Sequence, residues 1–370
     1  MHKAVLQTCF SRSWGGLEMV ALELAQRMHA EGLSITTACA PGSPLAERLE
    51  QAGLKTISVD RRNKYLSLKT ICTLRRELKS GKYSAVLVEQ LNELWQVVPA
   101  MWGIADLKLV GISHTLVGVQ KKDWLHGKLY SRVDRLVALT DIHRRNLLTN
   151  LPIREQNLAV IPNAVDLRRF NPSLRSESLR REFLGAEQGV LIGVVSRIDK
   201  GKGLLEVLEA AEILKTQGLA FRLIIVGRET IGEEGMLEVL RNDIARRQLA
   251  KHVFLIGHRP DIGAVTASLD LMVMPSPSET FGRVLIEAMA SGTAVIASSG
   301  GGVADIIHHE TDGLLVPPLQ PKPLAEAMQR CIRDRDLRNK LAAGGLRAAQ
   351  DRYDQKKLDR ELYALMGIQV

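Results

Sequence analysis

Short β-rich runs alternate with helical stretches along most of this chain, and no other feature constrains its fold as strongly. The pattern begins with KAVLQT and reaches NLAVIP through several strand and helix candidates. Strands that alternate with helices of this length indicate a parallel sheet with helices on both faces. The polar passage DLRRFNPSLRSESLRREFLGAEQ interrupts the pattern, which resumes with GVLIGVVS and continues to TAVIAS. We therefore expect an α/β protein with two doubly wound, Rossmann-like domains, over residues 1–165 and 166–351.

The length and composition agree with two globular domains. One hydrophobic core rarely supports 370 residues, and the content of 45% hydrophobic and 25% charged residues is ordinary. The start, MHKAVLQTCFSRSW, has too short an apolar run for a secretory signal, and no stretch reaches the roughly 18 to 20 apolar residues of a membrane span. The cysteines have no paired spacing, so we expect a reduced, cytoplasmic protein without a cysteine metal site. They are Cys9, Cys39, Cys72 and Cys331.

Positive charge is concentrated in the first half of the chain. The net charge is +9, and residues 1–165 hold 22 Lys and Arg against 14 Asp and Glu, whereas the remainder holds 28 against 27. A basic face attracts anionic lipid headgroups by on the order of 1 kcal/mol per nearby cation. We therefore expect the first domain to meet an anionic acceptor at the cytoplasmic membrane surface, as a peripheral protein. The clusters are RRNK at 61–64, Arg75-Arg76, Lys121-Lys122 and Arg144-Arg145.

The same charge has two alternative interpretations. Solvated helix faces account for any single cluster, and a basic surface also attracts nucleic acid. The chain holds only six Phe, five Tyr and four Trp, without the aromatic-rich basic stripe on which nucleobases stack. We expect no nucleic-acid partner.

The segment PSPSETFGRVLIEAMASGTAVIAS carries two glutamates around the start of a helix. LDLMVMP and TAVIAS predict buried strands, so Glu279 lies on the loop leaving a strand and Glu287 lies inside the next helix. Ligands of an open α/β sheet bind beyond the carboxyl ends of its strands. The first helical amides, around Gly282, Arg283 and Val284, would face the same place and attract an anion. An anion cradle between two carboxylates suits a nucleotide-activated sugar.

This segment resembles the nucleotide-sugar site of retaining glycosyltransferases of the GT-B fold, in particular glycosyltransferase family 4. The resemblance extends through SWGGLE near the start, IPNAVD in the middle, and SRIDKGKG and IVG in the second half. It implies two domains facing a central cleft, with a final helix at about residues 352–370 packed on the first domain. It also implies a nucleotide diphosphate sugar as donor, with a UDP-hexose expected, and retention of the anomeric configuration.

The acceptor is also suggested by resemblance. SWGGLE, the basic first domain and the missing export signal are similar to lipopolysaccharide core hexosyltransferases. We therefore expect a glycan or glycolipid acceptor, belonging to the lipopolysaccharide core or another cell-envelope glycan.

Four charged residues of the second half would bind the donor. Glu287 would hold the ribose hydroxyls, because a carboxylate accepts two charge-assisted hydrogen bonds from a vicinal diol. Glu279 would grip the sugar near the anomeric carbon and stabilise the positive charge that develops there. Arg197 and Lys202, in SRIDKGKG, would bind the diphosphate, as in the family. A solvated basic turn is the alternative for KGKG.

Four more positions complete the predicted site. Gly15 and Gly16 lie between the first strand and the first helix, where amides would approach the diphosphate unless the pair is only a tight turn. By resemblance, His114 contacts the sugar near the reacting carbon; an ordinary satisfied histidine is the alternative. Arg259, in LIGHRPDI, would line the nucleobase pocket or lie in a surface turn. The predicted catalytic residues are Glu279 and His114, and the predicted nucleotide-sugar-binding residues are Gly15, Gly16, Arg197, Lys202, Arg259, Phe281, Gly282, Arg283, Val284 and Glu287.

Two metal-like patterns are not expected to bind metal. DRD at 334–336 matches a DxD motif but lies in a charged helical run, and HHE at 308–310 places adjacent histidines in a polar turn where they cannot readily converge on one ion. We predict no metal and no cofactor. Arg197, Lys202 and the helix amides would neutralise the leaving diphosphate.

The expected enzyme is thus a metal-independent, retaining hexosyltransferase. Its reaction would be a same-face displacement in which the departing phosphate oxygen takes the acceptor proton. A nucleotide-sugar epimerase or a phosphorylase on the same fold is one alternative, although no lysine stands out as a pyridoxal phosphate anchor. A non-catalytic nucleotide-sugar-binding protein is another.

Overall fold

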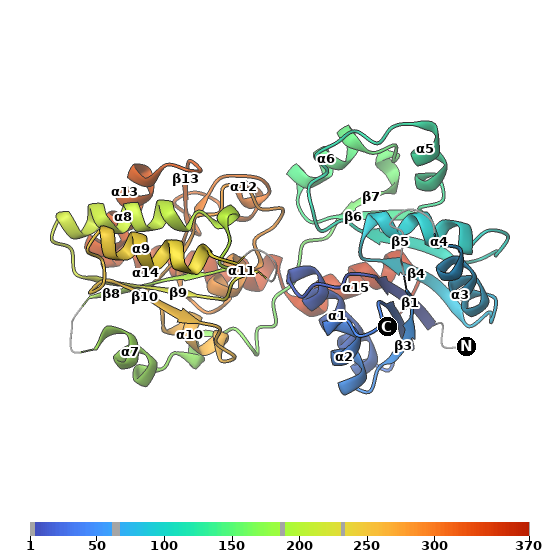
Figure 1. Cartoon of the computed structure of the whole chain (residues 1–370), viewed down its shortest axis with the longest axis horizontal. Coiled ribbons are helices and arrows are strands. Elements are labelled where there is room, and N and C mark those ends of the chain that lie inside the picture. Colours follow the sequence, from blue (N-terminus) through green and yellow to red (C-terminus); the bar gives the residue numbers. More distant parts are fainter. Residues whose placement is uncertain (1–3, 61–66, 186–188, 231–233, 370) are drawn as a thin grey trace. The chain divides into compact units, whose positions relative to one another are not determined.

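The computed structural model describes residues 4–60, 67–185, 189–230 and 234–369. It divides into two compact units (Figure 1), which we call unit 1 and unit 2. Unit 1 comprises Met1–Ile161 and Asp359–Val370, and unit 2 comprises Pro162–Leu358. The sequence predicts the boundary between the two domains at residue 165 and the start of the final helix, which returns to the first domain, at about residue 352. The basic run at 61–64 lies outside the described residues.

Unit 1 is built on a seven-stranded parallel sheet in the order β3-β2-β1-β4-β5-β6-β7. Its strands are β1 (Ala4–Cys9), β2 (Ile35–Cys39), β3 (Lys55–Ser58), β4 (Tyr83–Val88), β5 (Lys108–Ile112), β6 (Arg135–Ala138) and β7 (Leu158–Val160). Its helices are α1 (Gly16–Ala30), α2 (Pro44–Gln51), α3 (Leu68–Leu78), α4 (Leu94–Ala100), α5 (Trp124–Tyr130) and α6 (Asp141–Asn150), with 3-10 turns η1 (Leu91–Glu93) and η2 (Glu155–Asn157).

Unit 2 repeats the arrangement with six parallel strands in the order β10-β9-β8-β11-β12-β13. The strands are β8 (Val190–Val195), β9 (Phe221–Val226), β10 (Val253–Gly257), β11 (Leu271–Met274), β12 (Ala294–Ser298) and β13 (Leu314–Val316). The helices are α7 (Glu177–Leu184), α8 (Leu204–Thr216), α9 (Met236–Arg246), α10 (Ile262–Ser268), α11 (Arg283–Ala290), α12 (Val303–Ile306), α13 (Pro321–Arg333) and α14 (Arg335–Arg352), with turns η3 (Pro172–Leu174) and η4 (Lys200–Lys202); α15 (Gln355–Met366) then leads into unit 1.

The central strands are buried on both sides because helices cover both faces of each sheet. All six residues of β1 are buried, and in β8 only Val195 is partly exposed. In unit 2 the core joins β8, β9, β11 and β12 to α8, α9 and α13, while α10 and α11 contact each other and α11 contacts α14. Within the described ranges, no helix is both long and apolar enough to cross a membrane.

The end of the chain is held to unit 1 by a paired ion contact. Arg27 of α1 donates from Nε to one Asp359 carboxylate oxygen at 2.7 Å and from Nη2 to the other at 2.9 Å. Asp359 is 5% exposed, so this two-bond contact is largely shielded from water. Residues far apart in the sequence therefore complete one compact unit.

Both sheets reverse their strand order at one place, and this locates the candidate site. In unit 1 the reversal lies between β1 and β4, and in unit 2 between β8 and β11. The connections that follow the two strands at such a point run in opposite directions. This opens a crevice beyond the carboxyl ends of the two strands. The loops after β1, β4, β8 and β11 are therefore where ligand-binding side chains are expected.

Candidate functional site

The loops after β8 and β11 meet through an ion pair. Lys202 Nζ lies 2.7 Å from Glu279 Oε1, and the two side chains are 18% and 22% exposed. Lys202 ends the turn after β8, and Glu279 lies in the loop between β11 and α11. The structure thus brings together two of the predicted site residues across the reversal point of unit 2.

Gly203 allows the two loops to approach this closely. Its φ is +66°, and a Cβ at this position would lie 2.4 Å from the carbonyl oxygen of Pro275, far inside van der Waals contact. Asp199 shapes the turn before it, because its carboxylate accepts a hydrogen bond from the Gly201 amide at 2.9 Å. The backbone therefore fixes Lys202 beside the Glu279 loop.

A glycine run after β12 holds Glu279 from the other side. The Gly302 amide donates to the Glu279 carbonyl oxygen at 2.8 Å, and the Glu279 amide donates to the Gly300 oxygen at 3.4 Å. Gly301 has φ +70°, and a Cβ there would lie 2.1 Å from the Glu279 carbonyl oxygen. The predicted site did not include these glycines, although three consecutive glycines just beyond a buried strand are a usable signal for close backbone approach.

Arg197 lies in the same loop as Lys202 but has other partners. Its guanidinium is 3.3 Å from Asp199 Oδ2 and donates to Thr230 Oγ1 at 3.1 Å, with 53% of the side chain exposed. Asp199 and Thr230 were absent from the predicted set, and both hold Arg197 in place. A half-exposed guanidinium with one carboxylate partner can still form hydrogen bonds to an anion.

The start of α11 is formed by the residues expected there. Gly282 precedes the helix with φ +84°, and Arg283 Nη2 lies 3.5 Å from Glu287 Oε1, one turn further along. Val284 is partly exposed. Phe281 is 3% exposed and makes an edge-to-face contact with Tyr353, with 5.9 Å between ring centroids. The Phe281 ring is therefore part of the core of unit 2, which leaves its backbone as the part able to face a ligand.

Arg259 is placed apart from the Lys202–Glu279 pair. It follows β10, the edge strand of the sheet, and donates to Asp261 at 2.8 and 2.7 Å and to Glu182 at 3.1 Å. Both carboxylates form ion pairs with Arg259, and Asp261 above all raises the pKa of the guanidinium. This arrangement matches the surface-turn alternative, because the predicted nucleobase contact would require exchange of these partners.

His114 of unit 1 is joined to a buried carboxylate. Its Nε2 lies 2.9 Å from Glu89 Oε2, and the side chains are 7% and 0% exposed. Gln7 donates to the other Glu89 oxygen at 2.7 Å, and Thr37 donates to Gln7 Oε1 at 2.9 Å. An ionised carboxylate only accepts, so Glu89 selects the His114 tautomer with its proton on Nε2. Sequence reasoning missed Glu89, whose signal is an acidic residue directly after the strand YSAVLV.

His143 supports the same loop in its neutral form. Its Nδ1 accepts from the Leu139 amide at 3.3 Å, and its Nε2 lies 3.0 Å from Ser113 Oγ, next to His114. Burial lowers the pKa of His143 to about 4. His143 is therefore uncharged at neutral pH.

The glycine loop after β1 is already hydrogen-bonded internally. The Gly15 amide donates to Glu18 Oε2 at 2.8 Å, and Ser13 donates to the other Glu18 oxygen at 3.1 Å. Gly16 begins α1. An anion at the Gly15 amide would therefore have to displace Glu18, a competition that the Gly-Gly pattern alone does not reveal.

Further buried carboxylates surround the end of β1. Glu93 accepts from Thr8 Oγ1 at 2.6 Å and from the Phe10 amide at 2.5 Å. Burial, and then the charges of Glu93, Glu89 and Glu18, raise the pKa of the Cys9 thiol. The Cys9 thiol therefore stays protonated and unreactive.

The two metal-like patterns have structural roles. Asp334 accepts from the Leu337 amide at 2.8 Å at the start of α14, and Glu310 pairs with Arg330 at 2.6 Å. His309 Nδ1 accepts from the Leu315 amide at 3.0 Å. Within the part of the chain that the structure describes, no three His, Cys, Asp or Glu residues cluster as metal ligands.

Two family models match consecutive parts of the chain. The Glycosyltransferase Family 4 model matches residues 14–169, and the Glycosyl transferases group 1 model matches residues 176–347. The D-inositol 3-phosphate glycosyltransferase of Jonesia denitrificans is 29% identical over 91% of this chain and 87% of that protein. The UDP-Gal:alpha-D-GlcNAc-diphosphoundecaprenol alpha-1,3-galactosyltransferase of Escherichia coli is 24% identical over 89% of each.

Solved structures show the same fold. Anabaena Alr3699/HepE, crystallised with UDP and glucose, is 22% identical and superimposes with a TM-score of 0.83 over 99% of this chain and 100% of that chain. The likeness covers the sheets of both units.

Proposed function

Because this chain belongs to the glycosyltransferases that join a Family 4 domain to a group 1 domain, we propose that it moves a hexose from a UDP-sugar to an acceptor hydroxyl with retention of configuration. The observation that carries the proposal is the Lys202–Glu279 pair beyond β8 and β11. A cation and a carboxylate at a strand-order reversal match the two ends of an activated sugar, a diphosphate and a hydroxylated ring.

A bound donor would break the ion pair between Lys202 and Glu279 and give each residue a new partner. Lys202, with Arg197 beside it, would turn to the diphosphate, which carries more charge than the Glu279 carboxylate. Glu279 would then be released to the sugar, where it stabilises positive charge near the anomeric carbon. The amides at the start of α11 would add to the neutralisation of the leaving group, and Glu287 would hold the ribose. In this scheme, side chains and backbone amides of the protein neutralise the negative charge of the leaving diphosphate.

His114 would position the transferred sugar. Glu89 fixes the proton of His114 on Nε2, which leaves Nδ1 to accept a hydrogen bond from a hydroxyl. In the same-face displacement, the departing phosphate oxygen takes the acceptor proton while the new glycosidic bond forms. His114 therefore needs no basic role in this scheme.

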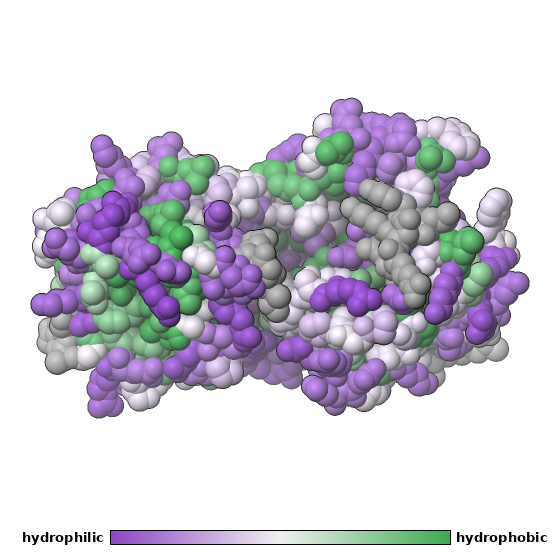
Figure 2. All heavy atoms as spheres, in the orientation of Figure 1, coloured by the Kyte–Doolittle hydropathy of each residue, from purple (hydrophilic) through white to green (hydrophobic). Residues whose placement is uncertain are grey.

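The acceptor proposed is a glycolipid of the cell envelope, reached by a cytoplasmic enzyme at the membrane surface. Around α5, unit 1 exposes Val119, Trp124 and Leu125 by 69%, 69% and 51%, close in sequence to Lys121 and Lys122. Figure 2 shows hydrophobic side chains among hydrophilic ones over this region. Exposed Trp and Leu mixed with Lys suit the headgroup layer of an anionic membrane. The Escherichia coli relative, whose named acceptor is a diphosphoundecaprenol lipid, supports this choice.

A phosphorylated polyol is the second candidate acceptor. The Jonesia denitrificans relative is named for D-inositol 3-phosphate, which is small, soluble and anionic. The basic excess of unit 1 suits this acceptor as well as a lipid.

The test is a panel of nucleotide sugars, read by thermal shift and by hydrolysis of the donor. One UDP-hexose should stabilise the protein, and Lys202→Ala should abolish the shift. Adding inositol phosphate or a lipid-linked glycan to the active donor separates the two acceptors. Absence of any stabilising or hydrolysed nucleotide sugar would refute the proposal, and an epimer formed from UDP-hexose alone would identify an epimerase instead.

A further inference from the structure

Unit 2 contains a polar hollow at the amino ends of its strands, whereas the Lys202–Glu279 pair lies beyond their carboxyl ends. Its volume is about 510 Å³, within the range of small-molecule sites. Three of its lining residues, Gly189, Asp270 and Gly292, come just before β8, β11 and β12, so the hollow lies at the amino ends of these strands. Because β8 has six residues, about 20 Å of strand separates the two ends.

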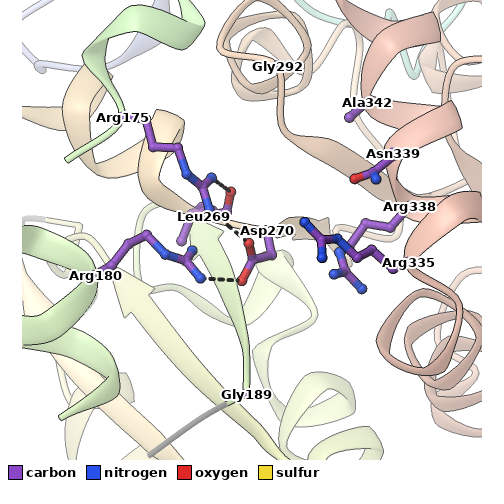
Figure 3. Close-up of a pocket in the computed structure, with 10 residues that line it drawn as sticks. All are labelled: Arg175, Arg180, Gly189, Leu269, Asp270, Gly292, Arg335, Arg338, Asn339 and Ala342. Atoms are coloured by element: carbon purple, nitrogen blue, oxygen red, sulfur yellow. Dashed lines mark hydrogen bonds and ion pairs between the residues drawn. The ribbon is translucent and has the colours of Figure 1, made fainter. Parts of the chain in front are cut away.

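Two arginines on one side of the hollow share a single carboxylate (Figure 3). Arg175 Nη2 lies 3.2 Å from Asp270 Oδ1, and Arg180 Nη2 lies 3.0 Å from Asp270 Oδ2. Asp270 Oδ2 also accepts from the Leu191 amide at 2.9 Å, and Arg180 donates to the Ser268 carbonyl oxygen at 2.7 Å. This side of the hollow is therefore a fixed network.

Two more arginines face it from α14. Arg335 and Arg338, with Asn339 and Ala342, line the hollow at the spacing of one helix face. In Figure 3 their guanidinium groups lie on the other side of Asp270 from Arg175 and Arg180. Arg338 donates to the Cys331 carbonyl oxygen. Among the described residues, no carboxylate lies within ion-pair distance of either guanidinium.

The hollow is thus lined by four arginines and one carboxylate, Asp270, and outside this lining Glu177 Oε1 lies 4.0 Å from Arg175 Nε. We infer that it binds a small, soluble anion bearing phosphate groups. Arginine is suited to this ligand because its planar group offers two parallel hydrogen bonds to phosphate oxygens. An anion here would pair with Arg335 and Arg338, whose charges Asp270 does not offset, and would join α14 to the Arg175–Arg180 network. The site is distinct from the proposed donor site, since the two lie at opposite strand ends.

The test is calorimetric titration of the full-length protein with sodium pyrophosphate in metal-free buffer at about 0.15 M salt, which screens exposed charges. All variants carry Lys202→Gln, which removes the main cation of the proposed donor site and weakens pyrophosphate binding there, and they are compared on this common background. Arg335→Gln/Arg338→Gln should weaken binding at least about 10-fold, the effect of losing charged hydrogen bonds. The matched control Lys340→Gln/Arg347→Gln removes two charges of α14 outside the hollow and should stay within about twofold.

Each contrary outcome overturns the inference. If Lys202→Gln alone abolishes pyrophosphate binding, the pyrophosphate binds only at the donor site. Equal affinity of the Arg335→Gln/Arg338→Gln variant and its control would exclude the hollow. Vesicles of phosphatidylglycerol separate the sources of phosphate: if Arg335→Gln/Arg338→Gln weakens vesicle binding but not pyrophosphate binding, the ligand is a headgroup and not a soluble anion. Donor turnover is read separately, so failure here leaves the proposed transferase reaction untouched.

Discussion

The two units have the same strand order around the reversal point, but the charged groups there differ in burial and in partners. In unit 2, Lys202 and Glu279 are partly exposed and neutralise each other. In unit 1, Glu89 and Glu93 are fully buried and are satisfied by Gln7, Thr8, His114 and the backbone. A partly exposed pair can be exchanged for a charged ligand at modest cost, whereas breaking a buried network leaves unsatisfied groups. Unit 2 is therefore suited to binding charge, and unit 1 to holding a side chain still.

The strongest test of this contrast is removal of the exchangeable pair. Glu279→Ala and Lys202→Ala should each lower kcat/KM for sugar transfer by about 10²- to 10³-fold, the loss expected for one electrostatic group in the transition state. Steady-state kinetics with the active UDP-sugar measure this effect. Glu238→Ala, at an exposed position of α9, is the control. Near-normal turnover of either site variant would remove that residue from its role.

The buried side of the contrast should appear as a pH effect on stability. The pKa of His143 is lowered from 6.5 to about 4 in the folded protein, so between these values the unfolded chain binds more protons. The free energy of unfolding should then fall by about 3 kcal/mol as the pH drops from above 6.5 to 4. Urea titrations across this range measure it. His143→Gln keeps a donor and an acceptor and should flatten this dependence; an unchanged slope would assign it to other groups.

Glu89→Gln should sharpen the distinction between positioning and binding. Both His114 and Gln7 donate to Glu89, and a glutamine offers only one acceptor oxygen to these two donors. We expect about a 10-fold loss of kcat and an altered pH dependence of kcat, with the KM for the donor little changed. Glu50→Gln, at an exposed position, is the control. A loss confined to thermal stability would mean that Glu89 only supports the fold.

The smallest expected effect concerns the uneven charge of the units. Lys122→Gln, near α5, should weaken binding to anionic vesicles about fivefold, which corresponds to about 1 kcal/mol, whereas Lys251→Gln in unit 2 should not. Vesicle sedimentation at low and high salt measures both variants. Equal retention on neutral and anionic vesicles would contradict electrostatic membrane binding.

The fold could be predicted from the sequence because its signals are local. Alternating apolar strands and helices indicated two doubly wound sheets, and the GT-B fold is confirmed. Lys202 and Glu279 could be placed at strand ends for the same reason. The order of the strands in the sheet decides which strand ends are neighbours, and no single segment of the sequence predicts that order.

The partners of the charged residues could not be predicted, because they lie far away in the sequence. Glu89 contacts Gln7, 82 positions earlier, and Arg259 contacts Glu182, 77 positions earlier. Each contact depends on tertiary packing, so the residue pattern around either partner does not reveal it. The buried carboxylates of unit 1 were missed because a glutamate beside a strand is usually exposed.

The return of Asp359–Val370 to unit 1 has a consequence for biosynthesis. Arg27 is translated early, but its partner Asp359 leaves the ribosome only after the whole of Pro162–Leu358. At about 5 to 20 residues per second, roughly 10 to 40 s separate the first part of unit 1 from its last helix. During this interval the first part of unit 1 lacks the segment that carries Asp359, whereas unit 2 can already fold because it is one contiguous segment.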